Sequence, residues 1–60
     1  MCLATVYKSS DETVLCRNIS RIDVDGDKVI VRDIIGEEKV IIGSIVMVDL
    51  ANSIVKIKCD

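Results

Sequence analysis

The apolar residues of this chain fall into short runs, and two of these runs alternate strictly with charged residues. Residues 21–24 read Arg-Ile-Asp-Val and residues 55–58 read Val-Lys-Ile-Lys. A period of two is the pattern of a β-strand that buries one of its faces. We therefore expect the apolar members of both runs, Ile22 and Val24 among them, to face a core while the charges face water.

Turn signals divide the rest of the chain at short intervals. Asp25-Gly26 is the strongest of them, because glycine tolerates the positive φ that a two-residue hairpin needs. Asn18 predicts a kink, and Gly43 predicts a break or a bulge between strands. The strands expected between these signals are residues 2–8, 12–17, 19–25, 27–33, 39–42, 44–50 and 53–59.

Valine and isoleucine supply most of the apolar residues, which favours strands over helices. The chain holds nine valines and ten isoleucines but only three leucines, and β-branched side chains suit a pleated surface. Short strands joined by tight turns predict an all-β fold, a small SH3-like or Sm-like antiparallel β-barrel of six or seven strands. Residues 1–60 are expected to form this single domain. An α+β fold is the weaker alternative, because no segment shows a period of 3.6 residues.

Several strands are apolar on both faces, at residues 29–31, 40–42 and 45–48. One face can fill the barrel, but the other needs a cover from outside. A second copy is the simplest cover, so we expect a two-fold homodimer that buries residues of the 40–42 and 45–48 runs. Ile41 is a representative position of that expected interface.

The composition excludes several classes of function. The chain has no histidine, which removes imidazole catalysis and imidazole metal ligands, and it has no apolar run long enough to cross a membrane. The net charge is −2 and Tyr7 is the one aromatic residue, whereas nucleic-acid binders usually carry basic surfaces and stacking aromatics. We therefore expect binding to neither nucleic acid nor membrane. The opening residues lack the pattern of an export signal, so we expect a cytoplasmic location with reduced thiols.

Cys2 is the most informative residue, because its thiol lies within one residue of the α-amine and of a backbone amide. A thiolate combined with amine or deprotonated amide nitrogens forms five-membered chelate rings and favours planar coordination. Planar nitrogen and sulfur ligation suits Ni(II) or Cu(II), whereas tetrahedral sulfur-rich sites suit Zn(II). The competing interpretation is a small buried cysteine at the start of a strand, and residue types alone leave both open.

The remaining cysteines and the acidic residues carry weaker signals. Cys16 and Cys59 form no Cys-x-x-Cys pair and lie far apart in the sequence, so we expect a packed Cys16 and an incidental Cys59 rather than a three-cysteine site. Asp33 and Asp49 each end a predicted strand, where a carboxylate usually caps a turn.

The opening sequence Met-Cys-Leu-Ala-Thr-Val-Tyr, residues 1–7, resembles the start of the CooT family of small nickel-binding proteins. Asp-Gly-Asp at 25–27, followed by Val-Ile-Val at 29–31, is similar to the central hairpin of that family. The later matches are Gly-Glu at 36–37, Lys-Val at 39–40, Gly-Ser-Ile at 43–45, Val-Asp-Leu at 48–50 and Ile-Val at 54–55.

This resemblance implies an SH3-like or Sm-like barrel, a homodimer and no catalytic activity. It implies Ni(II) bound through Cys2 at the dimer axis, with a nitrogen from the N-terminal amine, borne by Met1, or from the Cys2 amide. The protein would then be a metallochaperone that passes nickel to an enzyme such as carbon monoxide dehydrogenase or to its maturation factors.

Two alternatives stay open beside the nickel hypothesis. The first is a plain homodimeric interaction domain. The second is an Sm-like RNA-binding module, whose basic face would comprise Lys28, Arg32, Lys39, Lys56 and Lys58.

Overall fold

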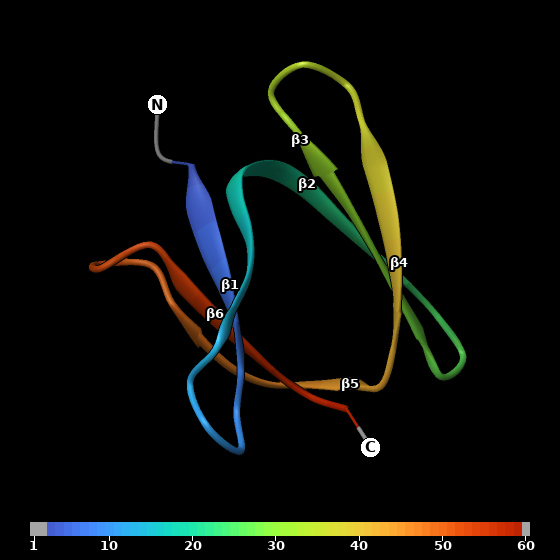
Figure 1. Cartoon of the computed structure of the whole chain (residues 1–60). Helices are drawn as coiled ribbons and strands as arrows, with labels where there is room; N and C mark the ends of the chain where they lie inside the picture. The colour runs from blue at the N-terminus through green and yellow to red at the C-terminus, as the bar shows by residue number, and fades with distance from the viewer. Residues whose placement is uncertain (1–2, 60) are drawn as a thin grey trace.

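The computed structural model describes residues 3–59, and all their regular structure is β-strand. Figure 1 shows six strands, which are β1 (Ala4–Lys8), β2 (Val14–Asp25), β3 (Lys28–Asp33), β4 (Glu38–Ile42), β5 (Ser44–Asp49) and β6 (Ile54–Lys58). No helix long and apolar enough to cross a membrane occurs in this part of the chain. The all-β fold class predicted from the sequence is confirmed.

The six strands form one sheet in the order β4-β3-β2-β1-β6-β5. Four of its ladders are antiparallel, but β1 and β6 run parallel, with Thr5 facing Ile54 and Lys8 facing Ile57. The purely antiparallel arrangement expected from the sequence is therefore wrong at this one ladder. A parallel pair needs a long connection, and the whole of β2–β5 provides it.

β2 is a continuous strand where the sequence predicted two strands separated by a kink. Asn18 takes a left-handed φ of 58°, which asparagine tolerates better than most residues. The register of the β2–β3 ladder also shifts between Ile19 and Arg21. The strand therefore bends without ending, and it pairs with β1 near its start and with β3 further on, as its curved path in Figure 1 shows.

The inner face of the curved sheet carries the core. Its buried residues are Val6, Ile19, Val29, Val31, Ile41, Val55 and Ile57. Burial of such side chains contributes roughly 1.5–3 kcal/mol each and is the main stabilising effect in so small a chain. Ile41 is only 9% exposed and pairs with Val29 across β3 and β4. Its expected place in a dimer interface is therefore wrong, because it belongs to the core of its own chain.

The sheet leaves one side of its inner face uncovered. Within residues 3–59, β4 and β5 are the two edge strands and no ladder joins them. Val24 lies opposite the core residue Val29, on the inner face as predicted, yet 62% of its surface is exposed. Val48 lies opposite the core residue Val55 and is 53% exposed. Both side chains face inward at the side where the sheet does not close.

Gly43 alone separates β4 from β5, at the position where the sequence predicted a break. A methyl group added to Gly43 would press on the Lys58 carbonyl oxygen and on the Cys59 backbone, neither of which can rotate away. We expect Gly43→Ala to lower the free energy of unfolding by about 1–3 kcal/mol, the usual cost of overpacking. Chemical denaturation measures this, with the exposed neighbour substitution Ser44→Ala as control. Equal stability of the two variants would contradict the close approach.

Candidate metal site and adjoining surfaces

The predicted ligand groups, the Cys2 thiol and the amine of Met1, lie outside the described residues. The structure does place the strand that follows them. Ala4 begins β1 and pairs with Ile19 of β2. The Thr5 N–H donates to the Ser53 carbonyl at 2.9 Å. The described chain thus enters the sheet between β2 and the turn that joins β5 to β6.

An apolar hollow of about 340 Å³ adjoins the start of β1. We call it the hollow, and the apolar residues that line it are Ala4, Ile19, Ile22, Val24, Ile45, Val48, Leu50 and Val55. Arg21 also lines it, but the guanidinium Nε of Arg21 lies 3.0 Å from a carboxylate oxygen of Asp23. The hollow is therefore a patch of inner-face side chains with a single, paired charge at its border.

The side chains around the hollow are unusually exposed for their type. Leu50 is 81% exposed and Val24 is 62% exposed. The removal of apolar surface from water contributes roughly 25 cal/mol of favourable free energy for each Å². A partner surface that covered the hollow would therefore bind favourably. Because Ala4 lies on the wall of the hollow, that partner surface would sit beside the start of β1.

Cys16 and Cys59 are free, half-buried and packed against the core. Cys16 lies opposite the core residue Val6 in the β1–β2 ladder. Among residues 3–59 no group of three side chains of the metal-ligating types comes together. The packing predicted for Cys16 is confirmed, whereas Cys59, which was expected to be incidental, also packs against the core.

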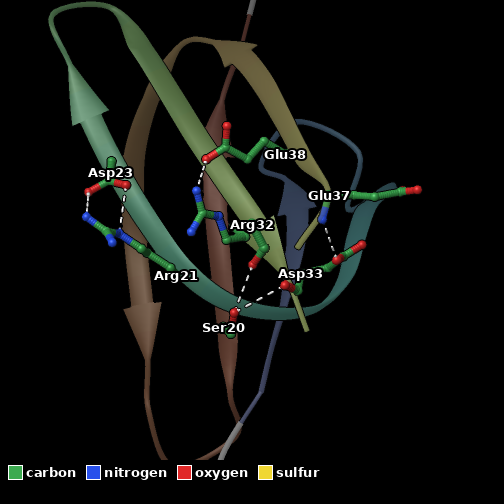
Figure 2. A network of polar contacts seen from close by, with 7 residues as sticks. All are labelled: Ser20, Arg21, Asp23, Arg32, Asp33, Glu37 and Glu38. Carbon is green, nitrogen blue, oxygen red and sulfur yellow. Dashed lines mark hydrogen bonds and ion pairs between the residues drawn. The ribbon is translucent and has the colours of Figure 1, made fainter. Parts of the chain in front are cut away.

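Asp33 fixes the turn between β3 and β4, as Figure 2 shows. Its Oδ1 accepts hydrogen bonds from the N–H groups of Ile35 and Glu37, both at 3.0 Å. Ser20 of β2 donates its hydroxyl to the carbonyls of Arg32 and Asp33, both at 3.3 Å. The capping role predicted for Asp33 is confirmed.

Asp49 fixes the turn between β5 and β6 in a similar way. Asn52 donates its side-chain amide to Oδ2 of Asp49 at 2.9 Å and its backbone N–H to Oδ1 at 3.2 Å. These hydrogen bonds, the side-chain one first, hold the pKa of Asp49 below its ordinary value, because they favour the charged form.

We expect Asn52→Ala to raise the pKa of Asp49 toward its ordinary value. A carboxylate whose pKa is lowered by folding stabilises the fold above its unfolded pKa, and this contribution disappears as the pH falls through the folded pKa. The variant should therefore be less stable than the parent at neutral pH and should approach it in acid. Carboxyl NMR titration and denaturation at both pH values test this. Asp11, whose pKa is lowered by Thr13, is the internal control and should not move. An unchanged Asp49 titration would contradict the assignment.

The basic residues named for an RNA-binding face do not form one free surface. Nη2 of Arg32 donates to Glu38 at 2.6 Å (Figure 2), and Nζ of Lys56 lies 3.1 Å from a Glu12 oxygen. β3 and β6, which carry four of the five residues, are separated in the sheet by β2 and β1. Neighbouring carboxylates and this separation weaken the concentrated positive potential that nucleic-acid binding requires.

Sequence reasoning did not identify the hollow. The alternation in β2 placed Val24 on the inner face, but alternation does not tell where a sheet fails to close over that face. The signal that was available is Leu50, a large apolar residue in a turn, which is a position where chains usually carry polar side chains.

Residues 1–58 match the family model described as CO dehydrogenase accessory protein CooT. The sequence matches none of the curated proteins. A crystal structure assigned to CooT from Carboxydothermus hydrogenoformans is similar with a TM-score of 0.88 at 16% identity, covering 98% of each chain. At that identity the likeness shows the fold alone. An accessory protein of this kind is not itself a catalyst. The match over residues 1–58 shows that this chain belongs to the CooT family of CO dehydrogenase accessory proteins.

Proposed function

We propose that this chain is a homodimeric nickel-binding metallochaperone that acts in the maturation of carbon monoxide dehydrogenase. The observation that carries the proposal is the position of Ala4 on the wall of the exposed apolar hollow. Cys2 precedes Ala4 by two residues. A second copy seated on the hollow would therefore bring the segments that carry the two Cys2 thiols toward each other.

The donors at the start of the chain are sulfur and nitrogen. Each copy supplies the Cys2 thiolate and one nitrogen, from the N-terminal amine or from the Cys2 amide. The amine belongs to Met1, or to Cys2 itself once Met1 is removed. Two copies complete a plane of two sulfur and two nitrogen atoms, which suits Ni(II) better than Zn(II). The sequence contains no histidine that could compete, and we place the protein in the cytoplasm, where thiols stay reduced.

The hollow supplies the apolar area that such a dimer needs. A two-fold interface uses the same surface patch of both copies, so Val24, Val48 and Leu50 would be buried in each copy. Of the two runs expected in the interface, 45–48 contributes Ile45 and Val48 to the hollow, whereas 40–42 does not line it. The proposed interface therefore retains residues of the 45–48 run of β5, as predicted from the sequence. Residues of β2 take the place of the 40–42 run of β4.

A site built from two chain termini suits delivery of the metal. An acceptor can replace the donors one at a time, because they belong to separate chains. Nickel is then a cargo, and no reaction is catalysed. The acceptor is carbon monoxide dehydrogenase or a protein that acts on it, in keeping with the accessory role of the family.

An anaerobic Ni(II) titration of the full chain tests this function. We expect one nickel ion per two chains, a thiolate-to-nickel charge-transfer band in the near ultraviolet, and the mass of a dimer. The absence of saturable nickel binding would overturn the proposal. Preferential binding of Zn(II) by all three cysteines would also overturn it, since such a site favours tetrahedral geometry.

A further inference from the structure

Within residues 3–59, the outer edge of β4 carries backbone groups that pair with no other strand, and the hydrogen bonds at its two ends show which residues they belong to. The Gly43 N–H donates to the Asp27 carbonyl at 2.8 Å, and the Asp33 N–H donates to the Glu37 carbonyl at 3.0 Å. In an antiparallel ladder the paired residues alternate along each strand. The odd-numbered residues of this segment therefore pair with β3, and residues 38, 40 and 42 turn their N–H and C=O groups away from it.

Two of these residues, Val40 and Ile42, carry apolar side chains on the outer face of the sheet. Val40 and Ile42 are each 55% exposed. Val40 lies opposite the half-buried Ile30 of β3. We call Ile30, Val40 and Ile42 the outer stripe. It is separate from the hollow, because Ile41, the residue between Val40 and Ile42, points to the core.

No other strand in residues 3–59 covers this edge, since β3 is the one strand that pairs with β4. Natural proteins usually protect an exposed edge with proline, with a bulge or with several charges. β4 has regular pairing along its whole length, contains no proline and carries two charges, on Glu38 and Lys39. Exposed backbone groups next to exposed apolar side chains are the features that strand addition uses.

We propose that the free edge of β4 binds an extended segment of a partner polypeptide as an added strand. The exposed residues of β4 define the chemistry of that segment. It carries β-branched residues opposite Val40 and Ile42 and an acidic residue opposite Lys39. Opposite Glu38 it carries a basic residue that shares the carboxylate with Arg32, since a carboxylate can accept more than one donor. Backbone hydrogen bonds from residues 38, 40 and 42 provide the attachment, and the side chains select the register.

A second copy fits this edge less well than such a segment. Antiparallel pairing centred on Val40 would place each Glu38 carboxylate opposite Ile42 of the second copy. Pairing centred on Lys39 would place two lysines opposite each other, which is destabilising. Pairing centred on Ile41 would overlap only residues 40–42 before the chain bends at Gly43. The charge pattern of β4 therefore favours a partner with complementary charges.

The probe for this proposal is the acetylated and amidated heptapeptide Thr-Ile-Thr-Val-Asp-Lys-Thr, added to the ¹⁵N-labelled full chain. In an antiparallel register it places Ile and Val opposite Ile42 and Val40, Asp opposite Lys39 and Lys opposite Glu38. We expect saturable shifts of the amide signals of residues 38, 40 and 42 below about 1 mM peptide. No such shift at that concentration would overturn the proposal.

Val40→Pro is the decisive variant, because the Val40 N–H points away from β3 and proline removes it without breaking the existing ladder. We expect the peptide to bind this variant about tenfold more weakly, the effect of losing one hydrogen bond. The control Val40→Thr keeps the N–H and the β-branch and should bind within about threefold of the parent. Equal binding by Val40→Pro and Val40→Thr would overturn the proposal.

A change in the peptide keeps the test valid if Val40→Pro does not fold. Methylation of the amide nitrogen of the peptide's valine removes the donor to the Val40 carbonyl and leaves the protein unchanged. We expect about tenfold weaker binding again, and unchanged affinity would refute strand addition. If the amides of residues 40 and 42 are protected from exchange without peptide, and dilution of the protein exposes them, a second copy occupies the edge and the partner proposal is wrong.

Discussion

Cys2→Ser should abolish the thiolate-to-nickel charge-transfer band while the sheet stays folded. The substitution removes the only thiol at the start of the chain and leaves a hydroxyl that remains protonated at neutral pH and is a poor ligand for Ni(II). We expect nickel affinity to fall by more than the roughly 10–100-fold that is lost when a group that only orients a ligand is removed. None of the core residues is altered, so the denaturation midpoint of the metal-free protein should not change. Absorption spectra and denaturation of the same samples measure both effects.

Cys16→Ser and Cys59→Ser are the matched controls for this substitution. Both side chains pack against the core, so each replacement should cost some stability while nickel binding is retained. Nickel binding by Cys2→Ser at the affinity of the parent would refute the terminal site. Loss of nickel in either control, with the fold intact, would refute it as well.

The pH dependence of nickel binding provides a further measure of the same site. Thiolate and amine or amide nitrogen must lose their protons before they bind the metal. Binding should therefore release protons and weaken steeply as the pH falls. A nickel affinity that did not change between neutral and mildly acidic pH would indicate carboxylate ligands instead.

Much of the fold could be predicted from the sequence because its signals are local. The Asp25-Gly26 sequence predicted a hairpin, and the structure has Gly26 at a φ of 60° with Asp25 paired to Lys28. Gly43 predicted the junction of β4 and β5. Asp33 and Asp49 predicted turns, and both carboxylates accept backbone hydrogen bonds there. Each of these features depends on residues within a few positions of one another.

The features that were missed depend on contacts between distant segments. The parallel pairing of β1 with β6 requires the path of the whole intervening chain. Alternation placed Val24 on the inner face correctly, but its 62% exposure depends on how far β5 lies from β2. Ile41 and Val40 are neighbours with the same character in the sequence, and only the register of β4 against β3 shows that Ile41 is core and Val40 is surface.

The candidate metal site also combines features that depend on local sequence with features that depend on contacts between distant segments. Cys2 could be proposed as a ligand from residue type and sequence position, because chelation by a thiolate and a neighbouring nitrogen is a local property. The hollow on which a second copy would sit could not be identified from the sequence, because it collects residues from β1, β2, β5 and β6. The identification of ligands and the identification of an interface are thus separate inferences, and separate variants must test them.

Val24→Asp should convert the dimer to a monomer without unfolding the chain. Val24 is 62% exposed and lines the hollow, so an aspartate there is solvated in the free chain and buried without a partner in the dimer. Burial of an unpaired polar group costs at least about 1–3 kcal/mol, and two-fold symmetry applies the cost twice. We expect the dimer dissociation constant to rise by roughly 100-fold or more. Nickel binding should weaken in parallel, because each copy holds half of the donors.

Val40→Asp is the matched control, since it makes the same substitution at a valine that is 55% exposed but belongs to the outer stripe. Sedimentation equilibrium should find this variant dimeric and Val24→Asp monomeric, while circular dichroism shows the same β-sheet in both. Ile41→Asp, by contrast, should unfold the chain, because it places a charge in the core. A dimeric Val24→Asp would show that the hollow is not the interface. A monomeric Val40→Asp would move the interface to β4 and would also refute binding of a partner segment at that edge, because one edge cannot hold both.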